Sequence, residues 1–293
     1  MSMPAFTKGC FKGFVSFRLL VFCLLLVVSA TLPAQTNDYP YHIGLIAGAA
    51  HYSGDLTDRP LVPEQISPAL GITGGMMLNR FIGIRATSMW FTLSAADSHS
   101  EDPIRNARNL SFRSRIWEGS VQVVVMAAFG KQIITPYLCG GVAAFRFNPK
   151  AKYNGEWVAL QPLGTEGQGL HPLQMRKYKL SSWGLPIGLG CRYRLTKQLA
   201  LFAEAAYRKT FTDYIDDVST NYYSKTELIE KRGEVAAALS DRSSEVIGEN
   251  NLFSAGSVRG NPNYNDGYFL LTFTAAWSLG NSQSSGLERC YKF

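Results

Sequence analysis

From about Tyr41 to Leu279 the chain alternates apolar residues with small or polar ones in short runs. In the clearest run, residues 182–195, every second residue from Trp183 to Leu195 is apolar, and glycines, a serine, a proline and two arginines lie between them. A period of two predicts β-strands with one apolar face and one small or polar face. Each run is roughly as long as a strand that crosses a bilayer. The predicted strands are residues 41–52, 69–78, 81–93, 115–129, 133–147, 182–195, 199–212 and 267–279, and only 133–147 leaves its two faces unassigned.

The joins between these strands are alternately very short and very long. Residues 79–80, 130–132 and 196–198 are hairpin turns, whereas residues 53–68, 94–114, 148–181 and 213–266 form long loops. This alternation predicts an all-β fold, an eight-stranded antiparallel transmembrane β-barrel over residues 41–279 in a bacterial outer membrane. Short periplasmic turns and long extracellular loops then place both termini in the periplasm. The longest loop is predicted to contain a short helix, capped by Thr226 and interrupted by Gly233.

The ends of the chain are predicted to lie outside the barrel. Residues 1–34 have a basic start, a short apolar core and small residues before a cleavage site after Ala30 or Ala34, the pattern of a secretory signal. An uncleaved anchor is the alternative. Residues 35–40 and 280–293 are then periplasmic segments. The formal net charge is +7, of which the signal carries +3, and the remaining +4 does not indicate nucleic-acid binding.

The polar faces indicate what fills the barrel. The interior of an eight-stranded barrel is just wide enough to be filled by side chains, so we expect no open pore. Charged residues on the inferred interior face are Arg85, Glu118, Arg192, Arg194, Glu204 and Arg208. The turn at Lys197 sets Arg192 opposite Phe202, and Glu204 is then its diagonal neighbour. We therefore predict an Arg192–Glu204 ion pair that acts as a structural strut.

Aromatic residues lie toward the strand ends that are remote from the short turns. These residues are Trp90, Trp117, Trp183 and Tyr207. Aromatic side chains in that position are typical of the girdle at a membrane interface. The alternative is the core of a soluble β-sandwich, which would leave the charged faces on the outside.

Candidate chemistry in the loops is weak. Asp213, Asp216 and Asp217 are interpreted as a solvated loop base, because they lack the glycine and the terminal glutamate of a calcium loop. The best available set for nucleophilic catalysis is His51, Ser53 and Asp55, which lie close together near the first loop. No other feature of the sequence supports a catalytic role for them. Phosphate-loop, zinc and dinucleotide motifs are absent from the sequence. We predict no enzymatic activity, cofactor, metal or small-molecule substrate.

Cysteine usage points to one unpaired thiol. Cys10 and Cys23 leave with the signal, and Cys139, Cys191 and Cys290 remain. An odd number in an oxidising compartment leaves one thiol free or bonded to another chain. Cys290 lies in the polar tail and is the candidate for an intermolecular disulfide or partner contact, with a free thiol as the alternative.

Several sequence segments, most of them in the loops, resemble a known family residue by residue, and we call them the literal runs. The runs are Asn148–Ala151, Leu160–Gly169, Tyr207–Thr220, Leu239–Ser243 and Arg259–Pro262. They resemble the outer-membrane barrel component of the type IX secretion system of Bacteroidota, the PorG family. The resemblance spans most of the mature chain.

The resemblance implies an accessory, non-enzymatic role beside a periplasmic ring built from the lipoprotein PorK and its partner PorN. We then expect the periplasmic contact to be formed by residues 35–40, the three turns and residues 280–293. The lipid of the outer membrane is the other expected partner, around the barrel. The competing hypothesis is a stand-alone OmpA-like barrel with a structural or adhesive role.

Overall fold

A computed structural model describes residues 41–279 except 60–61, 128–132, 171–175 and 249–251. These residues belong to one compact unit, residues 38–293, and a second unit, residues 1–37, lies outside the described residues. The predicted signal, Cys290 and the turn at 130–132 therefore also lie outside them. No helix in the described part is long and apolar enough to cross a membrane.

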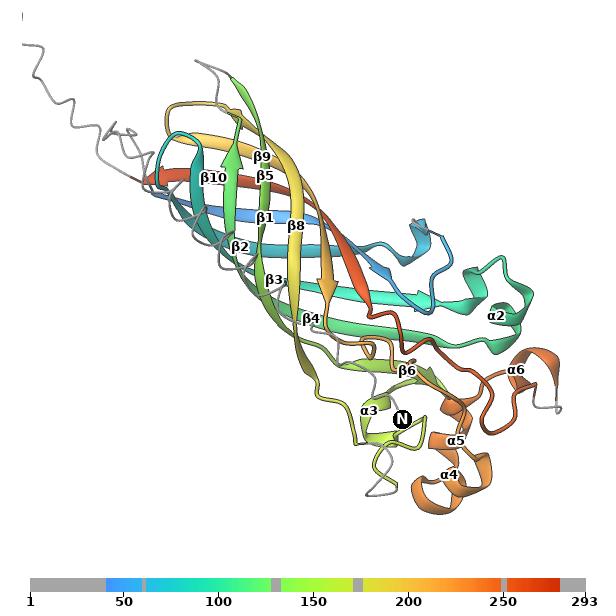
Figure 1. Ribbon diagram of the computed structural model, residues 1–293. Helices are drawn as coiled ribbons and strands as arrows, with labels where there is room; N and C mark the ends of the chain where they lie inside the picture. The colour runs from blue at the N-terminus through green and yellow to red at the C-terminus, as the bar shows by residue number, and fades with distance from the viewer. Residues whose placement is uncertain (1–40, 60–61, 128–132, 171–175, 249–251, 280–293) are drawn as a thin grey trace, which may run out of the picture. The chain divides into compact units, whose positions relative to one another are not determined.

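Eight antiparallel strands form a closed barrel (Figure 1). Its order is β3-β2-β1-β10-β9-β8-β5-β4, and pairing between β3 and β4 closes the ring. The barrel strands are β1 (Tyr41–Ser53), β2 (Ser67–Met77), β3 (Ile82–Ala96), β4 (Ser111–Met126), β5 (Ile134–Arg146), β8 (Ser181–Arg194), β9 (Leu199–Thr210) and β10 (Gly267–Leu279). The predicted fold is confirmed, and β3 and β4 extend further toward the loops than their apolar alternation indicated.

Two of the predicted turns are described, and side chains stabilise both. Asn79 Oδ1 accepts hydrogen bonds from the backbone N–H groups of Phe81 and Ile82, each at 2.8 Å. Thr196 Oγ1 accepts from the N–H of Leu199 at 2.9 Å. These side chains take up donors that have no strand partner, so each hairpin closes within a few residues.

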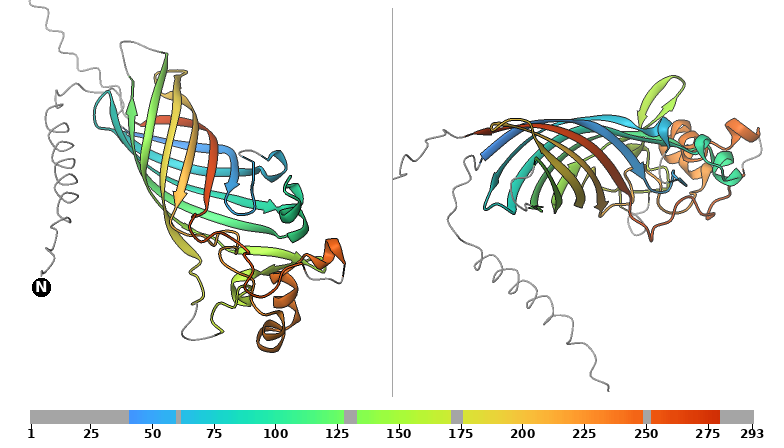
Figure 2. Two further views of the ribbon diagram at one scale, coloured as in Figure 1. Left: turned by 45° about the vertical axis from the view of Figure 1, so that its right-hand side comes forward. Right: turned by 90° about the horizontal axis from the view of Figure 1, so that it is seen from above.

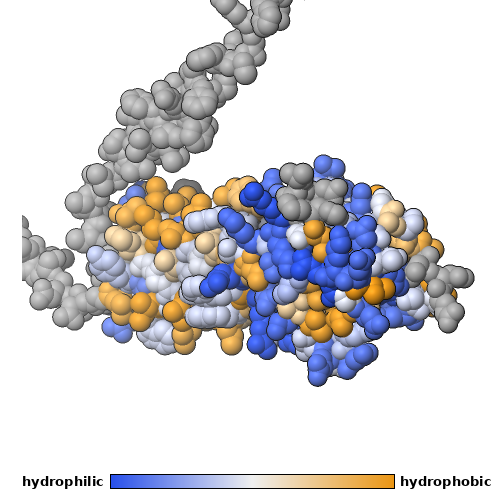
Figure 3. Space-filling view, turned by 90° about the horizontal axis from the view of Figure 1, so that it is seen from below, coloured by the Kyte–Doolittle hydropathy of each residue, from blue (hydrophilic) through white to orange (hydrophobic). Residues whose placement is uncertain are grey.

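The two faces of the strands are distributed as a membrane requires. On β1 Leu45 is 63% exposed on the outside, and on β4 Glu118 is fully buried inside. On β5, whose faces the sequence left open, Leu138 points outward and Tyr137 inward. The soluble-sandwich alternative is wrong, because charged side chains line the interior and apolar ones cover the outside. Figure 3 shows hydrophobic residues gathered over one part of one face and hydrophilic residues over the other.

The four long joins fold into a cap at the end of the barrel opposite the turns (Figures 1 and 2). We use "cap" for the described parts of residues 54–66, 97–110, 147–180 and 211–266. Its elements are η1 (Pro63–Gln65), η2 (Asp97–His99), α2 (Pro103–Arg108), β6 (Pro149–Tyr153), β7 (Glu156–Ala159), α3 (Leu160–Leu163), α4 (Lys225–Arg232), α5 (Glu234–Ser240) and α6 (Ser244–Ile247).

The prediction of one short helix in the longest loop needs correction. That loop contains α4, α5 and α6, and Gly233 divides α4 from α5 as the sequence indicated. The cap of α4 is Ser224, whose side chain accepts a hydrogen bond from the N–H of Glu227, rather than Thr226. A serine two residues earlier satisfies the free N–H groups of the first turn equally well.

An aromatic cluster separates the barrel interior from the cap. Tyr52 packs edge-on against Phe112 with ring centroids 4.8 Å apart. Tyr268 contacts both Phe91 and Phe145, at 5.4 and 5.9 Å. All five rings are buried, so their burial joins the cap to the top of the barrel.

Candidate functional site

The barrel interior is crossed by a strut between opposite walls. Arg85 Nη2 on β3 lies 2.6 Å from Glu204 Oε2 on β9, and these strands are four places apart in the ring of eight. Arg85 also donates to Gln122 Oε1, and the Tyr137 hydroxyl donates to Glu204 at 2.8 Å. Arg85 and Glu204 are thus paired with each other and hydrogen-bonded to neighbouring side chains, which makes their burial tolerable.

The predicted partner of Glu204 was wrong, although the predicted register was right. Arg192 does lie opposite Phe202, and Glu204 lies opposite Gly190. In the described structure, however, the carboxylate is bonded to Arg85, and the buried Nε of Arg192 has no hydrogen-bond partner. The barrel is so narrow that a long side chain from the far wall reaches Glu204, and hairpin register carries no information about the far wall.

A second layer crosses the barrel nearer the cap. The Tyr268 hydroxyl on β10 donates to Glu118 Oε2 on β4 at 2.6 Å, again between strands four places apart. Arg208 Nη2 lies 3.4 Å from the other oxygen of Glu118. These three side chains are almost completely buried. The two layers together close the barrel as the sequence predicted.

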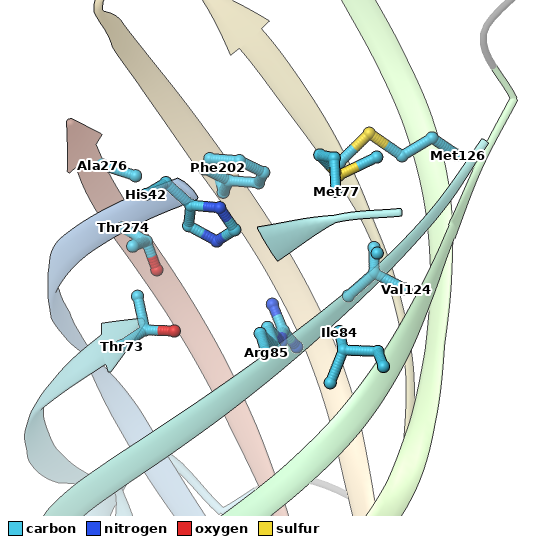
Figure 4. Close-up of a pocket in the computed structure, with 11 residues that line it drawn as sticks. His42, Thr73, Met77, Ile84, Arg85, Val124, Met126, Phe202, Thr274 and Ala276 are labelled. Atoms are coloured by element: carbon cyan, nitrogen blue, oxygen red, sulfur yellow. The ribbon is translucent and has the colours of Figure 1, made fainter. Parts of the chain in front are cut away.

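A small cavity remains below the first layer, near the turns (Figure 4). His42, Met77, Phe202 and Met126 surround it, and Arg85 forms its wall toward the cap. Its volume is about 20 Å³, which is room for about one water molecule. Within the described part of the barrel, the two layers and this small cavity leave no room for a translocating chain.

The literal runs of the loops meet in the core of the cap. Arg259, which is 2% exposed, donates from Nη1 to Glu166 Oε1 at 2.9 Å and to the carbonyl oxygen of Asp217 at 2.6 Å. Thr165 Oγ1 donates to Asp217 Oδ2, and Ser240 Oγ donates to the carbonyl oxygen of Thr165, both at 2.5 Å. Four runs that are far apart in sequence thus share one buried hydrogen-bond network.

Glu166 satisfies the backbone of a neighbouring run. Its carboxylate accepts hydrogen bonds from the N–H groups of Ser219 and Thr220, at 2.9 and 3.2 Å, and from the Thr220 hydroxyl at 2.7 Å. The carboxylate and the guanidinium of Arg259 are both buried and fully engaged. A buried charge pair in that state is a structural fixture.

A second buried ion pair, between Arg108 and Asp97, joins the loop of residues 97–110 to the same core. Arg108 and Asp97 form two parallel hydrogen bonds of 2.7 Å, from Nε and Nη2 of the guanidinium. The remaining Nη1 donates to the carbonyl oxygen of Arg259 at 2.5 Å. This paired geometry is the strongest form of arginine–carboxylate contact, and it fixes the loop against the network around Arg259.

The three aspartates at the start of the longest loop are buried, so the predicted solvated loop base is wrong. Asp213, Asp216 and Asp217 are 7%, 1% and 0% exposed. They are held by the folding of the cap around them, which sequence spacing did not reveal. Among the described residues no group of histidine, cysteine, aspartate or glutamate side chains is arranged to hold a metal ion.

Asp216 and Asp266 share a tyrosine. The Tyr52 hydroxyl lies 2.7 Å from Asp216 Oδ2 and 2.5 Å from Asp266 Oδ1. A hydroxyl carries one hydrogen and can donate to one carboxylate at a time, so the other carboxyl must be protonated to donate in return. Burial raises the pKa of Asp266 to about 7 and also raises that of Asp216. The pair therefore holds a proton at neutral pH.

Two further carboxyls have raised pKa values. Burial raises the pKa of Asp213 to about 8, and neither of its carboxylate oxygens has a hydrogen-bond partner within the described structure. Burial raises the pKa of Asp217 to about 6, and the charge of Arg259 opposes this effect. An uncompensated buried carboxylate is costly, so Asp213 stays protonated at neutral pH.

The weak catalytic set is not assembled. His51 Nε2 accepts a hydrogen bond from the N–H of Val62 at 3.0 Å. Asp55 Oδ2 accepts from the N–H of Asn261 at 2.7 Å. Both groups accept hydrogen bonds from the loop backbone. Among the residues that the structure describes, no acid bonds to His51 Nδ1 to orient the ring toward Ser53, as nucleophilic catalysis requires.

Comparison with protein-family models also indicates an outer-membrane β-barrel, in agreement with the closed barrel and its apolar outer face. The family model described as "Outer membrane protein beta-barrel domain" matches residues 20–227. The chain belongs to this family. Membership in this family places the protein in a bacterial outer membrane. Comparison with curated protein sequences found no match.

Solved outer-membrane proteins resemble the chain weakly. Neisserial surface protein A has 11% identity and a TM-score of 0.41, with 82% of this chain and 97% of that chain covered. OprG from Pseudomonas aeruginosa has 12% identity and a TM-score of 0.39, with coverages of 82% and 97%. Ail of Yersinia pestis, in complex with the heparin analogue sucrose octasulfate, has 8% identity, a TM-score of 0.38 and coverages of 82% and 99%. Likenesses of this size carry no information about what the chain binds.

Proposed function

We propose that this outer-membrane barrel is a non-enzymatic component of a type IX protein secretion machinery and belongs to the PorG family. The observation that carries the proposal is the convergence of the runs that resemble that family. Thr165 and Glu166, Asp217, Ser240 and Arg259 come from four of those runs and meet in one buried network. Their mutual contacts give a physical reason for the identity of these residues, which strand patterning alone does not require.

The role that fits such a barrel is anchoring. Two layers of side chains fill the interior, so cargo cannot pass through it. In our proposal the cap is extracellular, and the turns and both termini are periplasmic. The turn end then contacts the periplasmic ring of PorK and PorN through Asn79–Arg80, Thr196–Gln198 and the segments outside the described residues.

Gene deletion and complementation test this role in the native host. We expect deletion to abolish secretion of type IX cargo, and the tagged wild-type protein to restore it and to co-purify PorK and PorN. Replacing Arg80 and Lys197 at the turns by glutamate should lower ring recovery, because it reverses charges at the proposed contact. The matched control replaces Lys231 of α4 and Arg176 in the cap by glutamate and should recover the ring normally.

One outcome would replace the proposal by the competing one. Normal cargo secretion in the deletion strain, together with loss of binding to host or matrix surfaces, would identify a stand-alone OmpA-like barrel. Unchanged ring recovery in the turn variants would move the contact to residues 35–40 or 280–293.

Cys290 remains the proposed site of an intermolecular disulfide. Among the described cysteines, Cys139 is buried and Cys191 is exposed, and both are free. They point to opposite sides of the barrel wall, so they cannot pair with each other. Non-reducing electrophoresis of native membranes should show an adduct that Cys290→Ser removes, and an adduct that persists in this variant would rule Cys290 out.

A further inference from the structure

The outer surface of the barrel carries a group of cations directly beside the aromatic girdle. Arg113 and Arg115 lie on the outward face of β4, on the cap side of Trp117. Arg146 of β5 is the cross-strand partner of Trp117, and Lys150 of β6 is the partner of Arg113. All four cationic residues are exposed. We call Arg113, Arg115, Arg146 and Lys150 the cationic patch.

The position of the girdle gives the depth of this patch. Trp90 and Trp117 are cross-strand partners, 51% and 48% exposed, on the lipid-facing side. A strand rises about 3.4 Å per residue, so Arg115 and Arg113 lie roughly 7 and 14 Å along β4 from Trp117. With a strand tilt of about 40° these distances become heights of roughly 5 and 10 Å. Since the polar zone of a leaflet is about 5–8 Å thick, Arg146 and Arg115 lie within the headgroup zone, and Arg113 and Lys150 lie at its outer edge.

A hollow next to the patch offers room for a headgroup. It has a volume of about 360 Å³ and is lined by Arg113, Arg115, Asn148, Lys150 and Trp157. Trp157 belongs to the β6–β7 hairpin, which projects from the barrel wall (Figure 2). The Arg113 guanidinium lies 5.6 Å from the centre of the Trp157 ring. The hollow thus combines cations with an exposed aromatic face.

The patch has no internal counter-charge. Among the described residues no carboxylate forms an ion pair with any of its four cations. Arg85, Arg108, Arg208 and Arg259, by contrast, each lie against a carboxylate. Arginine presents several N–H groups in a plane that matches a phosphate, so an anion supplied from outside fits this site.

We propose that the cationic patch binds the phosphate groups of a glycolipid headgroup of the lipid A type. The phosphates contact the arginines and Lys150, and the sugar packs on the indole of Trp157. The choice of this lipid rests on the proposed function, in which the cap is extracellular. The extracellular leaflet of an outer membrane carries phosphorylated glycolipid. The patch itself rests only on the geometry above.

The test uses the purified full-length chain in phosphate-free detergent. Bisphosphorylated lipid A, its dephosphorylated form and phosphatidylglycerol are titrated separately, and bound lipid is counted by native mass spectrometry. We expect the wild type to bind bisphosphorylated lipid A at least tenfold more tightly than either other lipid. Arg113→Gln with Arg115→Gln should lose at least tenfold in affinity for it.

A charge-matched variant controls for net charge. Arg176→Gln with Lys231→Gln removes two exposed cations from the cap away from the patch and should bind like the wild type. Heat-modifiable mobility in electrophoresis checks that each barrel is folded. Equal binding of phosphorylated and dephosphorylated lipid A, or equal losses in the two variants, would overturn the proposal.

Two readouts separate this proposal from the proposed function. A preference for phosphatidylglycerol would overturn both the lipid assignment and the extracellular placement of the cap. Normal type IX secretion in a deletion strain would overturn the secretion role, yet it would leave the lipid titration as it stands, because the titration uses the purified chain alone.

Discussion

At the scale of single residues, Arg259 holds the cap together. It is buried, and it joins Glu166, Asp217 and the carbonyl oxygen of Ser240. Removing the guanidinium by Arg259→Ala leaves buried carboxylates without their cation, which costs about 3–5 kcal/mol. We expect the cap to become sensitive to limited proteolysis while the barrel keeps its heat-modifiable mobility. Arg59→Ala breaks an exposed pair with Glu101 and should change protease resistance little.

Asp213 makes the stability of the cap depend on pH. The ordinary pKa of Asp213 is 3.8, and burial raises it in the fold to about 8. Between these values the folded cap holds a proton that the unfolded chain has released, so cap stability should fall as pH rises from about 4 to 8. Near-ultraviolet circular dichroism follows this through the stacked rings of Tyr178 and Tyr214. Asp213→Asn should make the pH dependence shallower, while Asp266 and Asp217, whose pKa values are also raised, still contribute. An unchanged slope would exclude Asp213 as a source.

The sequence located the charged residues of the barrel interior but did not identify their partners. Alternation placed Arg85, Glu118, Glu204 and Arg208 inside, because each strand face can be read from its own residues. The partner of Glu204 could not be read in this way, because Arg85 reaches it from a strand four places away. That contact depends on barrel diameter and strand order rather than on local spacing.

At the scale of elements, strands were predictable and loops were not. β8 alternates without interruption, and its predicted and observed bounds differ by one residue at each end. The cap has no such period: Glu166, Asp217 and Arg259 come from irregular segments that only tertiary packing brings together. In the sequence these residues stood out only because they lie in the literal runs. The runs indicated a family but did not indicate which residues contact one another.

Close strand contact gives a prediction about β5. A Cβ atom built on Gly141 would lie only 2.1 Å from the carbonyl oxygen of Val121 on β4, whereas one on Gly119 meets nothing within 4 Å. Gly141→Ala must therefore push backbone apart, at a cost of about 1–3 kcal/mol. We expect a lower yield of refolded barrel in detergent, measured by heat-modifiable mobility. Gly119→Ala should refold like the wild type, and equal yields for both variants would contradict a steric role for Gly141.

At the scale of the whole molecule, closure is layered. The Arg85–Glu204 strut, the Glu118–Tyr268 bond and the aromatic cluster around Tyr52 follow one another toward the cap. The Arg85–Glu204 and Glu118–Tyr268 layers consist of strand residues alone and contact no residue of the cap network. Loosening the cap should therefore leave the barrel shut, because the interior layers remain.

This layering predicts the behaviour of the protein in planar lipid bilayers. Wild-type protein should produce no stepwise ion conductance, and the Arg259→Ala variant should be equally silent although its cap is loosened. An open porin recorded in the same bilayers supplies the positive control. Steady conductance steps from the wild type would show that the side-chain layers part in the membrane. Steps from the Arg259→Ala variant alone would make the cap the principal barrier and assign the interior layers a secondary role.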